Sequence, residues 1–432
     1  MTDISTGSGA VPLTTTDKVR ASLAKRHRKQ RTLQGFGIAA ISTAFLMLFI
    51  LLWSQIATGY KAFMQTNITL DIFVDPAEID VDRLPRGDFD DVLAAALIAN
   101  LPNVDAEDRA AVREASGILS NGAQFDLRDR IVEDPSLIGQ TINMRMPVSD
   151  PYDQLYKELL DRETPEELRR LNDVQVANFD ALYAAGAITS KLNTDLLTNA
   201  DSRFPELAGL KGALLGSFWA LLVCFLIAFP LGIGAAVYLE EFAPKNKVSD
   251  FIEVNINNLA AVPSVVFGLL ALSVFIGLFG LPRSVPFVGG LTLALMTMPT
   301  IIIATRAALK AVPPSIREAA LGVGASKQQV VFGHVVPLAM PGILTGTIIG
   351  LAQALGETAP LLLIGMNAFI TSAPGSPFDS ATALPTQIFI WADSPERGFV
   401  SRTSAAILVL LTFLIMMNAI AIYLRSKFER KW

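Results

Sequence analysis

Side chains that could perform covalent or metal chemistry are scarce in this chain of 432 residues. It contains one cysteine, Cys224, and two histidines, His27 and His334, which are far apart in the sequence. A single thiol forms no disulfide framework, and histidines without neighbours at ligand spacing do not form a metal site. The loop G-x-x-x-x-G-K-[ST], which binds nucleotide phosphates, is also missing from the sequence. We therefore predict no catalytic residue, no metal and no cofactor, and we do not expect an enzyme.

One charged side chain stands out, because Glu357 is the only Asp, Glu, Lys or Arg residue between positions 328 and 378. A carboxylate in the middle of a bilayer costs about 2.5–3.5 kcal/mol, so it should face a partner group or water. Counting from Pro337 places it in the outer part of an apolar stretch. Gly356 and Pro360 are expected to break the helix around it. An interfacial carboxylate with a structural role is the alternative interpretation.

A second candidate site is the charged, glycine-broken loop 313–337, which lies between two long apolar stretches. Two prolines precede an S-x-x-E pattern in which Ser315 is predicted to cap a helix and Glu318 to bond back to the cap. Glycines are predicted to end that helix after about two turns, the second of them being Gly324. A second pattern, S-x-x-Q, begins at Ser326 and starts the next helix. The loop is thus predicted to contain one short helix followed by a turn.

The short helix carries one small apolar stripe. Its members, at spacing i, i+3, i+4 and i+7, are Ile316, Ala319, Ala320 and Val323. A helix of two turns is not stable alone in water. The stripe must therefore lie either against helices of this chain or in a groove of another protein, and the pattern leaves both possibilities open.

The elements that position these residues are long apolar helices. Hydrophobic residues make up 51% of the chain, and six stretches are free of Asp, Glu, Lys and Arg. These stretches are 32–60, 212–239, 254–282, 284–305, 328–356 and 403–424. Each is longer than the roughly 20 apolar residues that cross a bilayer core. Backbone groups in lipid must be satisfied internally, so the sequence predicts an all-α, polytopic integral membrane protein.

Basic residues predict the orientation of the six spans. The regions that would share one side contain 17 Lys and Arg residues, whereas the opposite short loops contain three. This bias predicts that both termini are cytoplasmic. Residues 1–31 are then a basic cytoplasmic tail. The helix 32–60 has an apolar run too long for a typical secretory signal, so we predict an uncleaved first transmembrane helix.

Residues 61–205 form an acidic domain that the same topology places outside the cytoplasm. The domain contains 27 Asp and Glu against 14 Lys and Arg, a net charge of −13. Its pattern is mainly helical, with one short strand near residues 70–74. The acidity could select partners or simply mark a solvated surface. No pattern of a catalytic site occurs in it.

A stripe of small residues runs along the apolar stretch that comes after the loop. Gly342, Gly346 and Gly350 recur at every fourth position, continued by Ala354 and Thr358. Such a stripe allows two helix backbones to approach closely, so we predict helix packing along it. A lining for a substrate path is the alternative.

The loop resembles the cytoplasmic signature of ABC importer permeases. In that family the pattern E-A-A-x3-G is followed by a hydrophobic turn and a proline, and this chain has Glu318-Ala319-Ala320, then Gly324 and Pro337. The resemblance implies that residues 206–432 are a type I-like permease domain containing helices 2–6. It also implies that the short helix couples the membrane subunit to a separate ATPase.

A second stretch of sequence makes the resemblance more specific. Residues 354–363 read A-L-G-E-T-A-P-L-L-L, which is similar to PstA-type permeases of phosphate importers. The resemblance extends over roughly 210–432, and 61–205 resembles an extra domain found in a subset of these permeases. It implies a transport or gating role for Glu357 with its neighbour Thr358. Gln353 stands where the family commonly has an arginine, and Arg306 matches another family arginine, although it could equally be a positive-inside anchor.

The resulting hypothesis is a permease subunit of an ATP-driven phosphate importer in the cell inner membrane. The implied partners are a homologous permease subunit, an ATP-binding subunit dimer, an extracytoplasmic phosphate-binding protein, inorganic phosphate and membrane lipid, but no nucleic acid. A carboxylate does not attract phosphate, so Glu357 is assigned to gating or to pairing with a cation. The alternatives are a permease for another oxyanion, such as phosphonate or sulfate, a membrane sensor with an extracytoplasmic domain, and an ion-driven carrier.

Overall fold

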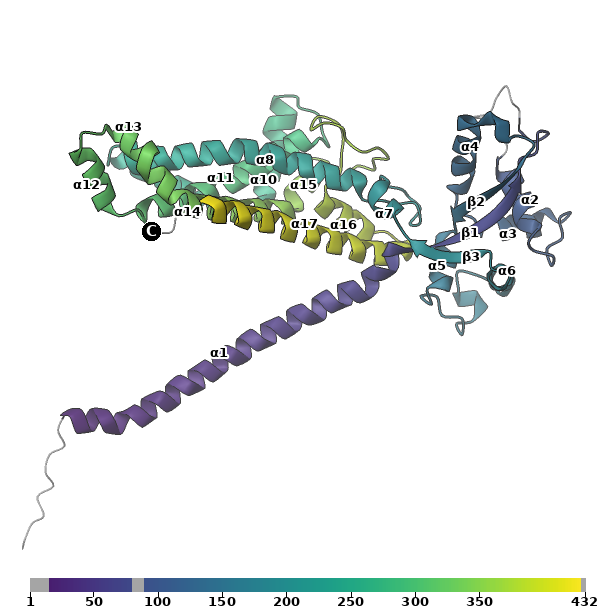
Figure 1. Ribbon diagram of the computed structural model, residues 1–432, viewed down its shortest axis with the longest axis horizontal. Helices are drawn as coiled ribbons and strands as arrows, with labels where there is room; N and C mark the ends of the chain where they lie inside the picture. The colour runs from purple at the N-terminus through teal and green to yellow at the C-terminus, as the bar shows by residue number, and fades with distance from the viewer. Residues whose placement is uncertain (1–14, 80–88, 429–432) are drawn as a thin grey trace, which may run out of the picture. The chain divides into compact units, whose positions relative to one another are not determined.

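The computed structural model describes residues 15–79 and 89–428 and consists of two units, Met1–Ala57 and Thr58–Trp432. Residues 1–14 of the predicted basic tail lie outside the described residues, as do Arg430 and Lys431. The first unit contains most of α1 (Thr15–Gly59) (Figure 1). The stretch Arg26–Phe63 is long and apolar enough to cross a membrane.

The second unit begins with the inserted domain, residues 61–205, which is built on a three-stranded antiparallel sheet. The strand order is β2-β1-β3, with β1 (Met64–Phe73) in the centre, β2 (Thr141–Pro147) on one side and β3 (Ile188–Leu192) on the other. The predicted single short strand is therefore the second half of β1. Strands β2 and β3 were missed, because each is short and its pairing partner is distant in the sequence.

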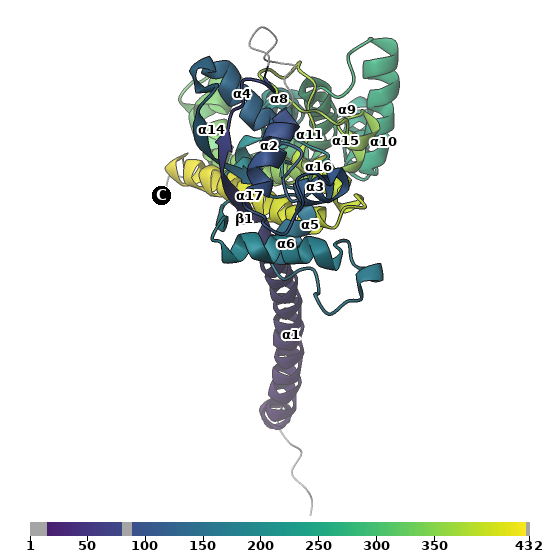
Figure 2. The ribbon, with the colours of Figure 1, turned by 90° about the vertical axis from the view of Figure 1, so that its right-hand side faces the viewer.

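Helices complete the inserted domain around this sheet (Figure 2). They are α2 (Phe89–Ile98), α3 (Arg109–Ser116), α4 (Ala123–Glu133), α5 (Asp150–Tyr156), α6 (Asp173–Ala184) and α7 (Asp195–Thr198), with short 3₁₀ turns at Tyr60–Phe63, Pro135–Leu137 and Glu166–Leu168. Alternate residues of β1, including Ile68 and Ile72, are buried in one core with Leu97, Leu127 and Phe179. The alternation follows from the period of two in a strand.

The remainder of the second unit is a helical bundle of long apolar helices. They are α8 (Lys211–Val237), α11 (Pro286–Lys310), α14 (Val336–Gly356) and α17 (Gly398–Phe428). A π-helical segment, η5 (Tyr238–Phe242), follows α8, and α13 (Lys327–Val330) with η7 (Val331–Val335) precedes α14. Together with the first helix, five described helices are long and apolar enough to span a membrane.

The predicted span 254–282 is a broken element and not one straight helix. Helix α9 (Lys247–Ala260) is followed by α10 (Ser264–Ala271) and η6 (Leu272–Leu278), and the two parts are bent by 101°. Pro263 lies at the break as the cap of α10. A proline has no N–H group and restricts the residue before it, so a helix ends there readily. Counting this pair as one span gives up to six spans in the described residues.

Helix α11 packs closely against both α8 and α14 through glycines. A Cβ added at Gly346 would lie 2.2 Å from Ala304 Cβ, and one at Gly342 would lie 2.6 Å from Ala308 Cβ. At Gly350 the nearest atom, from Ile301, would be 3.6 Å away, an ordinary contact. The small-residue stripe of α14 thus faces α11, and only its first two glycines are too close to α11 to accept a side chain.

Candidate functional site

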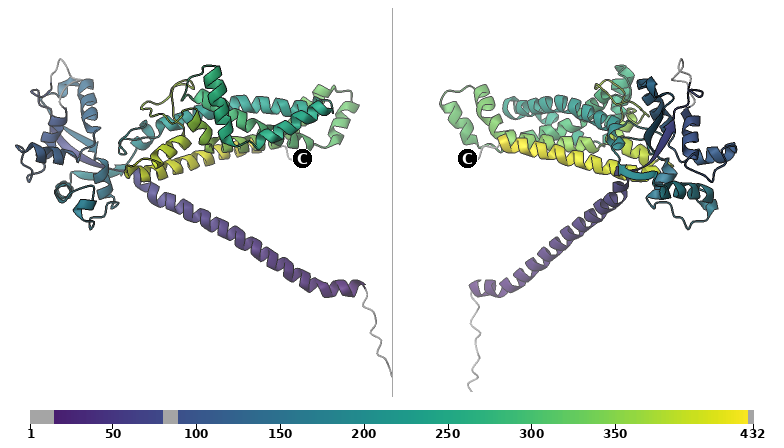
Figure 3. Two further views of the ribbon diagram at one scale, coloured as in Figure 1. Left: turned by 180° about the vertical axis from the view of Figure 1, so that it is seen from behind. Right: turned by 45° about the vertical axis from the view of Figure 1, so that its right-hand side comes forward.

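The short helix of the loop is α12 (Pro314–Gly322), and with α13 it lies at the end of the bundle opposite to the inserted domain (Figures 1 and 3). The prediction that Ser315 caps α12 is wrong. Pro313 is the cap, Pro314 is the first helical residue, and no side chain bonds to the first amides. Proline suits the first turn because its fixed φ is helical and its missing N–H would have no partner there. Ser315 and Glu318 are exposed positions within the helix.

Gly324 ends α12 by adopting a conformation that favours glycine. Its φ is +86°, and its N–H donates to Leu321 O at 3.0 Å, while Ala325 N–H donates to Ala320 O at 3.2 Å. This pair of bonds is the Schellman motif, which reverses the chain after a helix. The second capping box is confirmed, since the Ser326 and Gln329 side chains each bond to the other's backbone.

The predicted apolar stripe of α12 is divided between two environments. Ile316 and Ala320 are half-buried and pack on a cluster of this chain that includes Leu309 and Val331. Ala319 and Val323 are exposed, and the exposed fraction of Val323 is 86%. Leu321, which lies outside the predicted stripe, is 51% exposed. One face therefore attaches α12 to the bundle, and another presents apolar side chains outward.

Arg317 fixes α12 to two other helices, a role that sequence reasoning missed. Its guanidinium donates to the carbonyl oxygens of Leu309 at 2.9 Å and Val312 at 2.7 Å, at the end of α11. It also pairs with Glu241 of η5 at 2.7 Å. Basic side chains commonly bind the free carbonyls at a helix C-terminus, so the position of Arg317 just after α11 was a usable signal.

Arg306 belongs to a neighbouring group of ion pairs and is not a lone anchor. It lies 3.3 Å from Glu240 of η5 and 2.8 Å from Glu253 of α9, and Lys310 lies 3.6 Å from Glu240. Its side chain is 14% exposed. Arg306, Arg317 and their carboxylates thus join η5, α9, α11 and α12 at one end of the bundle.

Glu357 lies at the break that the sequence predicted. Helix α14 ends at Gly356, Glu357 has extended backbone angles, and α15 (Ala359–Leu363) starts after Thr358. Glu357 and Thr358 are half-buried, whereas Gln353, one turn earlier, is exposed. Within the ranges that the structure describes, the Glu357 carboxylate has neither an ion pair nor a hydrogen bond. It is thus separate from the charged groups around α12.

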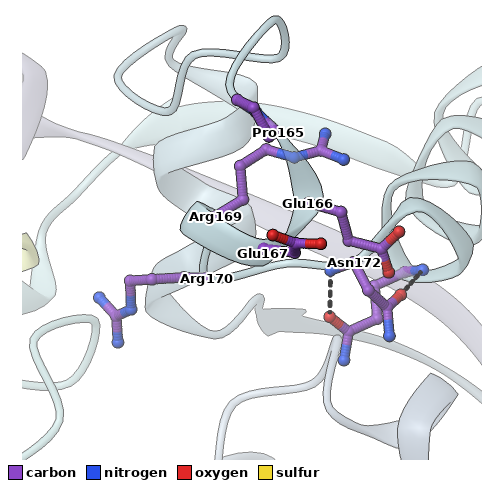
Figure 4. A pocket seen from close by; sticks show the side chains of 7 residues that line it. Pro165, Glu166, Glu167, Arg169, Arg170 and Asn172 are labelled. Atoms are coloured by element: carbon purple, nitrogen blue, oxygen red, sulfur yellow. Dashed lines mark hydrogen bonds between the residues drawn. The ribbon is translucent and has the colours of Figure 1, made fainter.

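The pocket drawn in Figure 4 lies in the inserted domain, where Glu166 and Glu167 occur beside Arg169 and Arg170. Its drawn hydrogen bonds belong to the capping box between Asn172 and Gln175, which starts α6. These bonds have a structural role. Among the described residues, no group of three or more His, Cys, Asp or Glu side chains is arranged to hold a metal ion.

Comparison with known sequences identifies the family. Residues 228–430 match the binding-protein-dependent transport system inner membrane component. A probable ABC transporter permease of Bacillus subtilis, YqgI, is 31% identical over 237 residues, which are 51% of this chain and 80% of that protein. The chain belongs to the PstA-type family of binding-protein-dependent ABC importer permeases. It is a multi-pass inner membrane protein.

Two further relatives are named as phosphate transport permeases. The phosphate transport system permease protein PstA of Haemophilus influenzae is 30% identical over 241 residues, covering 56% of this chain and 83% of that protein. PstA 1 of Mycobacterium tuberculosis is 32% identical over 224 residues, covering 52% and 72%. Residues 20–166 match a domain of unknown function, DUF3333, consistent with the extra domain. The methionine transporter MetNI, a solved structure, matches with a TM-score of 0.39 and 16% identity over 50% of this chain and 95% of that one.

Proposed function

We propose that this permease is the membrane subunit of an ATP-driven importer of inorganic phosphate. Relatives named as phosphate transport permeases support this cargo, as does the G-E-T-A-P string from Gly356 to Pro360. A homologous permease subunit encloses the path together with this one. A phosphate-binding protein delivers the anion from outside, and an ATP-binding subunit dimer drives the cycle.

The exposed apolar face of α12 is the observation that carries the coupling role. Leu321 of α12 and Val323, the residue that caps its C-terminus, are exposed, and the helix is too short to be stable alone. An apolar helix face of this kind fits a groove of another protein. Arg317 would pass the movement of α12 to α11 and η5, because it bonds to both. The ATP-binding subunit is therefore assigned to this face of α12.

Vesicle uptake tests the coupling role. Val323→Asp would bury a charge in the groove of the ATP-binding subunit, so we expect ATP-driven phosphate uptake to fall at least about tenfold. The protein level in the membrane should stay normal because Val323 contacts little of its own chain. Ser315→Ala, another exposed position of α12, is the matched control and should transport normally. Normal uptake by the Val323 variant would remove α12 from the coupling mechanism.

The orientation belongs to the same proposal. The basic residues favour α12 and both termini on the cytoplasmic side and the inserted domain outside. A membrane-impermeant maleimide applied to intact cells should label Tyr183→Cys, on the exposed surface of α6. It should label Val323→Cys only after the membrane has been opened. The reverse result would invert the topology.

Glu357 is proposed to act at the gate. Its carboxylate is half-buried at a helix break and has no partner in the described part of this chain, so a cation of the partner permease is its proposed counter-charge. Thr358 and Gln353 belong to the same proposed region. Glu357→Gln should reduce phosphate uptake while the complex still assembles. Wild-type uptake by this variant would leave Glu357 with a structural role.

Competition identifies the anion. Uptake of labelled phosphate should be blocked by unlabelled phosphate and should persist with the same concentration of sulfate or methylphosphonate. Stronger competition by either of these would change the cargo while leaving the ABC permease assignment in place.

A further inference from the structure

The inserted domain is in close contact with the first turn of the last membrane helix. Gly398, the first residue of α17, lies against Asp150, the first residue of α5. A Cβ added at Gly398 would be 1.8 Å from Asp150 Oδ1 and 2.8 Å from Pro205 Cβ. Any other residue at position 398 would therefore displace the Asp150 carboxylate and press against Pro205.

One turn further along α17, Arg402 is buried under the inserted domain, with an exposed fraction of 5%. Its guanidinium donates to the carbonyl oxygen of Ala208, just before α8. Four carboxylates lie near enough to stabilise its charge, namely Asp150, Asp153, Asp195 and Glu206. None of them comes within the 4.0 Å of a direct ion pair in the described ranges. Because arginine does not lose its proton in proteins, this charge depends on acidic residues of the inserted domain and on Glu206, which directly follows it.

The inserted domain holds these carboxylates in place. Asp150 accepts from Gln154 Nε2 at 2.7 Å and from Arg170 at 3.1 Å. Asp153 accepts from Lys157 Nζ at 2.5 Å and from the backbone N–H of Thr66 in β1 at 3.1 Å.

Glu206 is 4% exposed and accepts from Ser120 Oγ at 2.8 Å. Burial raises the pKa of Glu206 and lowers the pKa of Lys157, as expected for charged groups enclosed by protein.

An apolar layer extends the same contact to a second element. Phe399 of α17 and Trp391 of α16 (Leu384–Ala392) have ring centroids 5.6 Å apart. Trp391 Nε1 donates to Asp201 at 3.0 Å. Both rings belong to one buried cluster with Leu196 of α7 and Leu210. We call Asp150, Asp153, Glu206, Gly398 and Arg402, with this layer, the α17 junction.

We propose that the α17 junction makes the inserted domain and the adjoining ends of α16 and α17 one rigid body, which stays closed throughout the transport cycle. The inserted domain is then not a tethered head, but a built-in extension of the last membrane helix. Its position sets the position of α17, and a force applied to it would be transmitted to α17. This inference rests on the family assignment and needs no particular cargo.

A disulfide across the α17 junction tests the proposal. The Cβ at position 398 lies 2.5 Å from Asp150 Cγ, so it is at most about 4 Å from Asp150 Cβ, which is not too far for a disulfide. The variant Asp150→Cys/Gly398→Cys is oxidised in membranes and compared with the same sample after reduction. We expect equal uptake in both states. Loss of uptake on oxidation and its recovery on reduction would show that the junction must open, and would overturn the proposal.

Controls and a second measurement cover the case in which this variant transports poorly even when reduced. The single variants Asp150→Cys and Gly398→Cys show effects of substitution without a bond, and the native thiol, Cys224, is buried.

Hydrogen–deuterium exchange on the wild-type complex needs neither substitution nor cargo. Residues 150–156 and 398–406 should remain protected in the resting state and in the state trapped with ADP and vanadate after ATP hydrolysis. Loss of protection in either state would overturn the proposal, while an incorrect cargo would leave this result unchanged.

Discussion

The two ends of the helical bundle both contain buried or half-buried arginines, but the partners of these arginines and the surfaces around them differ. At the α12 end, Arg306 and Arg317 form direct ion pairs with Glu240, Glu241 and Glu253, while apolar side chains of α12 remain exposed. At the other end, Arg402 is covered by the inserted domain and has no carboxylate within 4.0 Å among the described residues. The first end has a surface free for a separate protein, whereas the second is already occupied by the chain's own domain.

This difference has an energetic consequence. The ion pairs at the α12 end are partly exposed, so water can reach their partners when a pair is broken, and each pair contributes less than a fully buried one. A buried arginine whose charge is balanced only by enclosed carboxylates cannot be removed or released without leaving charges uncompensated. The α12 end is therefore suited to contacts that form and break, and the α17 junction is suited to permanent contact.

The largest expected effect comes from removing the buried arginine. Arg402→Met leaves the buried Glu206 carboxylate without its nearby cation and the Ala208 carbonyl without its donor, while Asp153 keeps Lys157, so we expect a loss of about 3–5 kcal/mol in stability. Arg306→Met, at the other end, should cost about 1 kcal/mol or less, because Glu253 can be solvated and Glu240 still pairs with Lys310. Thermal unfolding of both variants in detergent measures the difference. Equal losses of stability would mean that Arg402 stabilises its end of the bundle no more than Arg306 stabilises the other.

A second comparison concerns the glycines between the two ends. Gly346→Ala places a methyl group 2.2 Å from Ala304 Cβ, and such overpacking costs about 1–3 kcal/mol. Gly350→Ala, one turn away on the same helix face, has its nearest neighbour at 3.6 Å and should be neutral or slightly stabilising. Thermal unfolding and the amount of assembled complex report both effects. A neutral Gly346 variant would show that α11 and α14 can separate without loss.

A third prediction concerns the side chain that attaches α12 to the bundle, as distinct from the exposed apolar side chains of α12. Arg317→Gln removes the pair with Glu241 and weakens the bonds to Leu309 and Val312. Charge-assisted bonds of this kind contribute about 1.5–3 kcal/mol, so we expect several-fold slower uptake while ATP hydrolysis continues. The ratio of phosphate transported to ATP hydrolysed is the measurement. A parallel fall in both activities would indicate that Arg317 supports assembly and not force transmission.

The smallest expected effect is a change in pH dependence at the α17 junction. Burial is the largest cause of the raised pKa of Glu206 and outweighs Ser120 and Arg402, which act in the opposite direction. Its stabilising contribution is therefore complete below the ordinary value of 4.5 and is lost as the pH rises through the raised folded-state pKa. Glu206→Gln removes this titration. Its melting temperature should fall less than that of the wild type between about pH 4.5 and neutral pH. The same pH profile in the variant and the wild type would mean that Glu206 does not cause this pH dependence.

Much of the molecule could be predicted from local sequence patterns. Long uncharged stretches must form helices in lipid, and they predicted the membrane elements with one correction, the 101° bend before Ser264. Proline and glycine chemistry predicted the short α12, its end at Gly324 and the interruption after Gly356. These features depend on residues within a few positions of one another, so they can be predicted from a single sequence.

Contacts between distant segments were decided only by the tertiary structure. The Ser315 cap was wrong because Pro314 starts the helix earlier, and the predicted stripe is divided because the bundle covers Ile316 and Ala320 but not Val323. The sheet of the inserted domain and the environment of Arg402 join residues that are far apart along the chain. The sequence by itself therefore determined which long apolar segments are helical and that the loop contains a short helix followed by a turn. Tertiary packing decided which charges are buried together, because burial depends on the segments that surround a side chain and not on its neighbours in the chain.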